Sequence, residues 1–87
     1  MNTRQFAVRC ATSQPVSTEQ LRAELTAGGL EEVVVVPDAQ GDKLLIKGLA
    51  LAESRDAAVA LVEDQIYDAT LDLIILEPGV WVDEGIR

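Results

Sequence analysis

The sequence predicts a small α+β domain whose elements follow the order strand, helix, strand, strand, helix, strand. Two observations predict this order. Stretches in which polar and apolar residues alternate are separated by stretches in which apolar residues recur every three or four positions. In addition, Gly, Pro, Asp or Ser residues stand at the boundaries between these stretches. With 87 residues, of which 48% are apolar, we expect one domain over 1–87.

The first strand is expected over 5–11, where apolar and polar side chains alternate. A break follows, and Ser17 is expected to cap a helix over 18–27. Gln20 stands three residues after Ser17, which is the spacing of a capping box. Gly28 and its glycine neighbour supply the flexible backbone that ends many helices.

Four β-branched residues in a row, 33–36, predict the second strand, and 43–49 predict the third. The loop 37–42 between them contains Pro, Asp and Gly, which is typical of a hairpin. Ser54 is expected to cap the second helix, whose apolar stripe runs over 58–69.

The last strand is expected over 71–77, and 78–87 is expected to be a short C-terminal tail. Two strand-helix-strand halves joined by a hairpin form the ferredoxin-like, or split βαβ, arrangement. Its right-handed crossovers place both helices on one face of a four-stranded antiparallel sheet. The other face of the sheet is then uncovered.

The net charge of −8 is concentrated in the second half of the chain. Residues 1–52 carry six acids and five bases, a net charge of −1, whereas 53–87 carry nine acids and two bases, a net charge of −7. This balance argues against direct binding of nucleic acid or of anionic membranes, which requires clustered bases. Because the chain also has no long apolar stretch and a single cysteine, we expect a cytoplasmic protein.

No residue pattern in the chain predicts catalysis, a metal site or a cofactor. Cys10 is the only thiol, and the chain has no histidine to activate it, so we expect a buried core residue. Asp38 and Asp42 flank the hairpin loop, but two carboxylates supply too few oxygens for a calcium ion. We therefore expect a protein that is not an enzyme and holds no metal or cofactor.

Alternation along the strands places a group of apolar side chains on the face without helices. Such a patch is of the size that marks interaction sites. We expect another protein chain to cover it, either a second copy or a different partner, and the alternative is cover by the tail that contains Trp81. The predicted interface comprises Ala7, Val34, Val36, Leu45, Leu49, Ile74, Leu76 and Trp81.

These observations predict a small non-enzymatic protein-interaction module, self-associating as a homodimer or docking on a partner. An alternative is an acidic inhibitor that imitates nucleic acid and blocks a basic cleft of another protein. Its partner face would comprise Asp56, Glu63, Asp64 and Asp68 on the second helix. A second alternative is a small-molecule-sensing regulatory domain, with its ligand near the connection 13–15 between the first strand and helix.

Overall fold

The computed structural model describes residues 2–13, 16–38, 42–69, 73–77 and 79–83, and within them an antiparallel sheet and two helices. The predicted α+β class is therefore confirmed. In chain order the elements are β1 (Asn2–Thr12), α1 (Thr18–Ala27), β2 (Glu31–Pro37), β3 (Lys43–Ala52), α2 (Arg55–Ala69), β4 (Leu73–Ile75) and β5 (Trp81–Val82).

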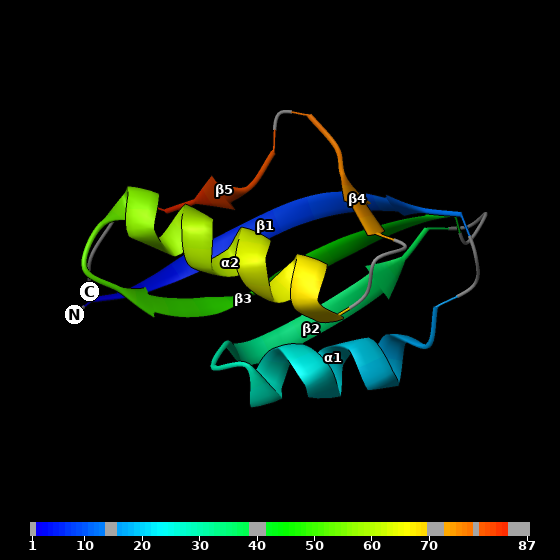
Figure 1. The fold of residues 1–87 in the computed structure, drawn as a ribbon, viewed down its shortest axis with the longest axis horizontal. Coiled ribbons are helices and arrows are strands. Elements are labelled where there is room, and N and C mark those ends of the chain that lie inside the picture. Colours follow the sequence, from blue (N-terminus) through cyan, green and yellow to red (C-terminus); the bar gives the residue numbers. More distant parts are fainter. Residues whose placement is uncertain (1, 14–15, 39–41, 70–72, 78, 84–87) are drawn as a thin grey trace.

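The sheet has the strand order β2-β3-β1-β4, and every pair in it is antiparallel. β1 and β3 form its centre, with Ala7 opposite Lys47. β4 and β5 pair with different parts of the same edge of β1. β4 pairs with residues 10–12, and β5 pairs with Phe6 and Ala7. Figure 1 shows α1 running alongside β2 and α2 lying across β1 and β3, and the contacts between these elements agree with this view.

The strands differ in length from the prediction. β1 and β3 are longer than the predicted 5–11 and 43–49, because they pair with each other along their whole length, from Asn2 opposite Ala52 onward. Pairing with a neighbouring strand thus extends both strands beyond the predicted bounds.

The C-terminal segment also differs from the prediction. Trp81 and Val82, expected in a tail, form β5 and extend the sheet along β1. Of the predicted last strand, Leu71 and Asp72 lie outside the described residues, and β4 covers Leu73–Ile75.

Both predicted helix caps are confirmed. The Ser17 hydroxyl accepts a hydrogen bond from the backbone N–H of Gln20 at 3.3 Å. The Ser54 hydroxyl accepts one from the N–H of Ala57 at 3.1 Å. After α1 the chain turns at Gly29, whose φ of 111° is accessible mainly to glycine.

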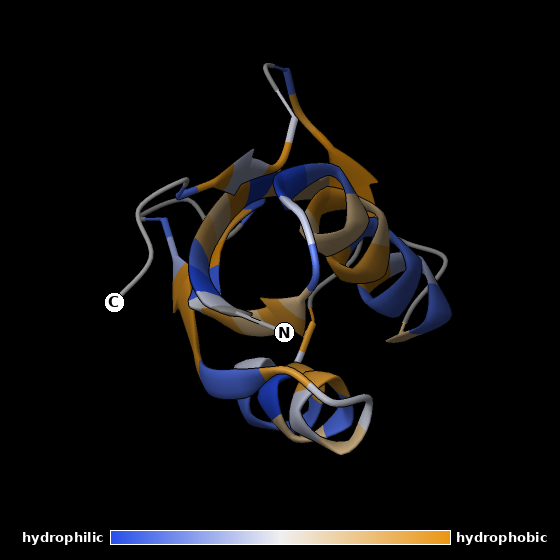
Figure 2. Cartoon of the chain, turned by 90° about the vertical axis from the view of Figure 1, so that its left-hand side faces the viewer, coloured by the Kyte–Doolittle hydropathy of each residue, from blue (hydrophilic) through white to orange (hydrophobic). Residues whose placement is uncertain are grey.

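One hydrophobic core lies between the helices and one face of the sheet. Leu21 and Leu25 of α1 and Val62 and Ile66 of α2 contribute to it. From β1 and β3 it contains apolar side chains at even-numbered positions: Phe6, Val8, Cys10, Leu44, Ile46, Ala50 and Ala52. The sheet curves around the two helices, as the side view in Figure 2 shows. Of the strand residues that face this core, Val35 and Ile75 are partly buried, and six others are buried: Phe6, Val8, Val33, Leu44, Ile46 and Leu73.

β2 contains a bulge that the sequence does not predict. Glu31 pairs with Leu49 and Val34 with Lys47, so two residues of β2 stand opposite the single residue between Leu49 and Lys47. Glu32, within the bulge, has a φ of +50°. This left-handed conformation is unfavourable for a residue with a side chain, by about 1–2 kcal/mol.

Replacing Glu32 with glycine should therefore raise the free energy of unfolding by up to about 1 kcal/mol, since glycine adopts a positive φ without steric cost but loses more entropy on folding. Urea denaturation measures the change. The matched control is Glu31→Gly in the same strand, at a position without positive φ, where glycine should lower the stability. Equal effects at the two positions would contradict the strain at Glu32.

Candidate functional site

The face of the sheet that points away from the helices, here called the open face, carries the predicted apolar residues. Val34, Trp81 and Ile74 are 51%, 51% and 62% exposed. Val36 is also exposed, whereas four others are half-buried: Ala7, Leu45, Leu49 and Leu76. The structure thus brings these residues together on one surface, and their role as an interface stays a prediction.

Leu51 belongs to the same surface and was missed by the sequence reasoning. It is 49% exposed and pairs with Thr3, beyond the predicted end of the third strand. The sequence contains a signal for this position, because residues 45, 47, 49 and 51 lie two apart and therefore share one face of the strand.

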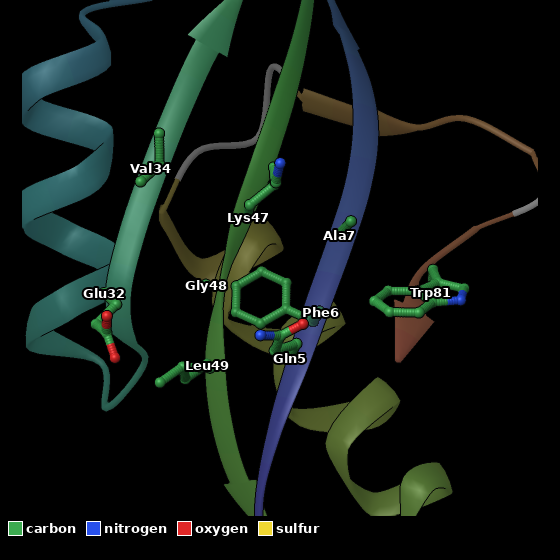
Figure 3. A pocket seen from close by; sticks show the side chains of 9 residues that line it. All are labelled: Gln5, Phe6, Ala7, Glu32, Val34, Lys47, Gly48, Leu49 and Trp81. Carbon is green, nitrogen blue, oxygen red and sulfur yellow. The ribbon is translucent and has the colours of Figure 1, made fainter. Parts of the chain in front are cut away.

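The described part of the C-terminal segment does not lie over the open face. Val82 is buried in the core, and Trp81 pairs with Ala7 at the edge of the sheet. Figure 3 shows the Trp81 ring beside β1, next to Ala7. Residues 80–83 therefore widen the open face, and the alternative of cover by the tail is limited to residues outside the described part of the chain.

Among the described residues, three shallow hollows lie on the open face. The largest, of about 360 Å³, extends from Val34 of β2 to Trp81 of β5. A second, of about 220 Å³, is bounded by Ala7 and Trp81 as well, and has an almost wholly apolar lining. The third, also about 220 Å³, shares Arg9 and Leu45 with the second. Because neighbouring hollows share residues, they form one continuous surface into which side chains of a partner can fit.

The open face carries charges of both signs. Arg9 on β1 and Lys47 on β3 are exposed, and neither side chain has an ion pair or hydrogen bond with the described residues. Glu31 and Glu32 are exposed along β2, and Glu32 lines the same hollow as Lys47. Figure 3 shows the Lys47 and Glu32 side chains pointing in different directions. These groups are available to charges on another molecule.

The predicted acidic face lies on α2. Asp56, Asp64 and Asp68 are exposed, and Glu63 is half-buried. The buried residues of α2 are on its other side, so the four acids point away from the core. Tyr67, which the sequence reasoning did not single out, is 45% exposed between Asp64 and Asp68 in the chain.

Cys10 is completely buried in the core, and burial raises its pKa to about 11. Thiols of this kind are protonated near neutral pH and are poor nucleophiles. The described residues contain no group of three or more His, Cys, Asp or Glu placed to hold a metal ion. Of the connection 13–15, the ligand position of the alternative regulatory domain, only Ser13 is described.

Arg4 is the buried charged residue among those described, with 8% of its surface exposed. It stands on the core side of β1, and its Nε has no hydrogen-bond partner among the described residues. The prediction began the first strand at residue 5, so it gave no reason to expect this burial.

The two described helices are short: α1 has 10 residues and α2 has 15. Neither has the length and apolar character that a membrane-spanning helix requires.

Comparison of the chain with protein-family models, with curated proteins and with solved structures finds no significant match.

Proposed function

We propose that this chain is a non-enzymatic protein-interaction module of ferredoxin-like topology that binds a partner through the open face. The strand order β2-β3-β1-β4 supports that topology, since α1 connects β1 to β2 and α2 connects β3 to β4. In this reading β5 is an addition that pairs with the remaining part of β1.

The observation that carries the proposal is the concentration of exposed apolar side chains on one face of the sheet. Ile74, Trp81 and Val34 each expose at least half of their surface, and they come from three different strands. Soluble monomers rarely expose contiguous apolar patches of more than a few hundred Å². Burial of this surface by a partner would stabilise the complex by about 25 cal/mol for each Å² of apolar surface removed from water.

A capture experiment with surface variants tests the proposal. The immobilised chain is incubated with an extract of its source organism to which the purified, labelled chain has been added. Wild type should retain a partner, which is either the labelled chain or another protein. Ile74→Asp and Val34→Asp should weaken that binding about 100-fold or more, because each buries an unpaired carboxylate in the interface.

Ala23→Asp is the matched control, because it adds the same charge at an exposed position of α1. It should bind as wild type does. The proposal is wrong if the open-face variants retain everything that wild type retains. It is also wrong if only Asp64→Lys and Asp68→Lys abolish binding, which would identify the acidic face of α2 as the binding surface.

A further inference from the structure

Arg9 is an exposed cation on the open face, and its direct neighbours on that face are apolar. It stands opposite Leu45 of β3. On the β4 side, the backbone N–H of Leu76 donates a hydrogen bond of 2.9 Å to the carbonyl oxygen of Arg9. Ala7 and Ala11 lie two residues away along β1 and therefore share its face. None of these four neighbours has a side-chain group that accepts a hydrogen bond from the guanidinium group of Arg9.

The diagonal positions beside Arg9 on β3 are occupied by Lys43 and Lys47, which are exposed and lie two residues on either side of the residue opposite Arg9. Side chains at such diagonal positions lie about 7–8 Å apart, so the three cations repel one another. Towards β2, Glu32 lines the same hollow as Lys47. Asp38 stands next to Lys43, to whose carbonyl oxygen it donates its backbone N–H. In the described part of the chain, no acid stands at a direct or diagonal position beside Arg9 itself.

An apolar hollow lies between Arg9 and Trp81. Its volume is about 220 Å³, and Leu45 and Leu76 also line it. A hollow of this size accommodates one large apolar side chain. Arginine and tryptophan are over-represented among the residues that contribute most to binding at protein interfaces. The structure places one residue of each kind at the same hollow.

A partner that covers the open face must also cover Arg9. The residue lies on a central strand, with β3 and β2 on one side and Ile74 and Leu76 on the other. Burying its guanidinium group without an opposite charge is unfavourable, because the group loses its hydration. A carboxylate offsets this loss, since it accepts two parallel hydrogen bonds from an arginine. The position of Arg9 therefore selects a partner that brings a negative charge into the middle of an apolar contact.

A protein carboxylate fits this position better than the phosphates of a polyanion. Nucleic acids and anionic membranes bind through clustered bases, and the net charge of −8 repels such densely charged partners at long range. Nucleic acid phosphates would also leave the hollow beside Arg9 without an apolar group to fill it. A segment of a protein can present one carboxylate beside apolar side chains, so it supplies both kinds of contact.

A second copy of the chain is a poorer occupant. Two open faces in contact would bring Arg9, Lys43 and Lys47 of both copies into one interface. The acids of α2 could approach the open face of another copy only head to tail, and contacts of that kind form rings or filaments rather than closed pairs. A different protein is therefore the expected partner.

We propose that the open face binds a different protein, whose docking segment places an Asp or Glu carboxylate on Arg9 and an apolar side chain in the hollow between Arg9 and Trp81. This inference rests on the proposed function, since it states the chemistry of the partner for the same surface. Arg9 is then the residue that selects the partner, and the exposed apolar residues supply the contact area.

Selection from a phage-displayed library of random peptides tests the inference. Immobilised wild type should enrich peptides that carry Asp or Glu next to large apolar residues. Arg9→Glu should not enrich acidic peptides. Arg22→Glu is the matched control, because it makes the same change in net charge at an exposed position of α1. This control should enrich the same peptides as wild type.

Calorimetry with one enriched peptide, made synthetically, gives the size of the effect. Arg9→Glu and Arg9→Gln should each weaken the binding at least about 30-fold, because the carboxylate of the peptide is buried without its partner. Arg22→Glu should change the binding less than about fivefold. A peptide with an amide in place of the acid should bind wild type as weakly as the original peptide binds Arg9→Gln. A peptide with lysine in its place should bind Arg9→Glu more tightly than wild type, which also shows that this variant is folded.

The inference is overturned if wild type enriches no acidic peptides, or if Arg9→Glu enriches them equally. Binding of oligothymidine, or of vesicles of phosphatidylcholine and phosphatidylserine, that is lost with Arg9→Glu would also overturn it, because Arg9 would then bind phosphate groups. A wild-type dimer that Arg9→Glu dissociates would make a second copy the occupant, against the inference. Light scattering coupled to size exclusion gives the oligomeric state.

Ile74→Asp separates this inference from the proposed function. Enriched peptides that are neutral or basic, but do not bind Ile74→Asp, would refute the role of Arg9 and leave the open face as the binding surface. Enriched peptides that bind Ile74→Asp and Arg9→Glu as tightly as wild type would contradict the proposed function, because the binding surface would lie elsewhere. Acidic peptides that lose binding to both variants would support the inference and the proposed function together.

Discussion

Replacing Gly48 with alanine should lower the free energy of unfolding by about 1–3 kcal/mol, and valine should lower it further. A Cβ at this position would lie 2.9 Å from the carbonyl oxygen of Glu31 and 3.0 Å from Cε2 of Phe6. Phe6 pairs directly with Gly48 and is fully buried in the core, so its ring cannot move away into solvent. Figure 3 shows the Phe6 ring between β1 and β3, beside Gly48.

The sign of this effect is informative, because strand propensity alone predicts the opposite. Glycine weakens a strand interior, and a β-branched residue normally strengthens it. Chemical denaturation of Gly48→Ala and Gly48→Val distinguishes the two expectations. Phe6→Leu removes the ring atoms that approach the new Cβ, so Gly48→Ala should cost less in that background than in wild type. A gain in stability for Gly48→Val would refute the close packing at this site.

Cys10 should react with iodoacetamide at least about 100-fold more slowly than an exposed thiol at pH 8. Burial raises its pKa from 9.0 to about 11, which reduces the reactive thiolate by about this factor, and the side chain has no exposed surface. Ser13→Cys in a Cys10→Ala background provides an exposed cysteine as the control. Mass spectrometry follows the labelling, and in denaturant both cysteines should react at similar rates. Fast labelling of native Cys10 would contradict its burial.

The same pKa predicts how stability depends on pH. The thiol is protonated in the folded and unfolded states below about pH 9, so it causes no pH dependence there. Between about pH 9 and 11 the unfolded state loses this proton first, and the free energy of unfolding falls. Cys10→Ala should lack this part of the fall.

The caps, the helices and the faces of the strands were predictable because they depend on residues close together in the chain. Ser17 and Ser54 bond to backbone groups three residues away, and the helix expected over 18–27 is the observed α1. Alternation alone separates the buried side chains of the strands from those on the open face, since successive side chains point to opposite faces. Local sequence patterns do not determine the role of the open face, which stays a proposal.

Tertiary structure decided the features that depend on strands meeting at a particular register. Pairing with β3 makes β1 begin at Asn2, and it carries Arg4 into the buried side of the sheet. Pairing with β1 turns the expected tail into β5 and places Trp81 beside the open face. The sequence by itself determined the two helices with their caps and the two-sided pattern of the predicted strands, because these follow from periodicity and from residues close together in the chain. Only the fold determined which residues stand opposite one another, because register is set by contacts between segments that are distant in the chain.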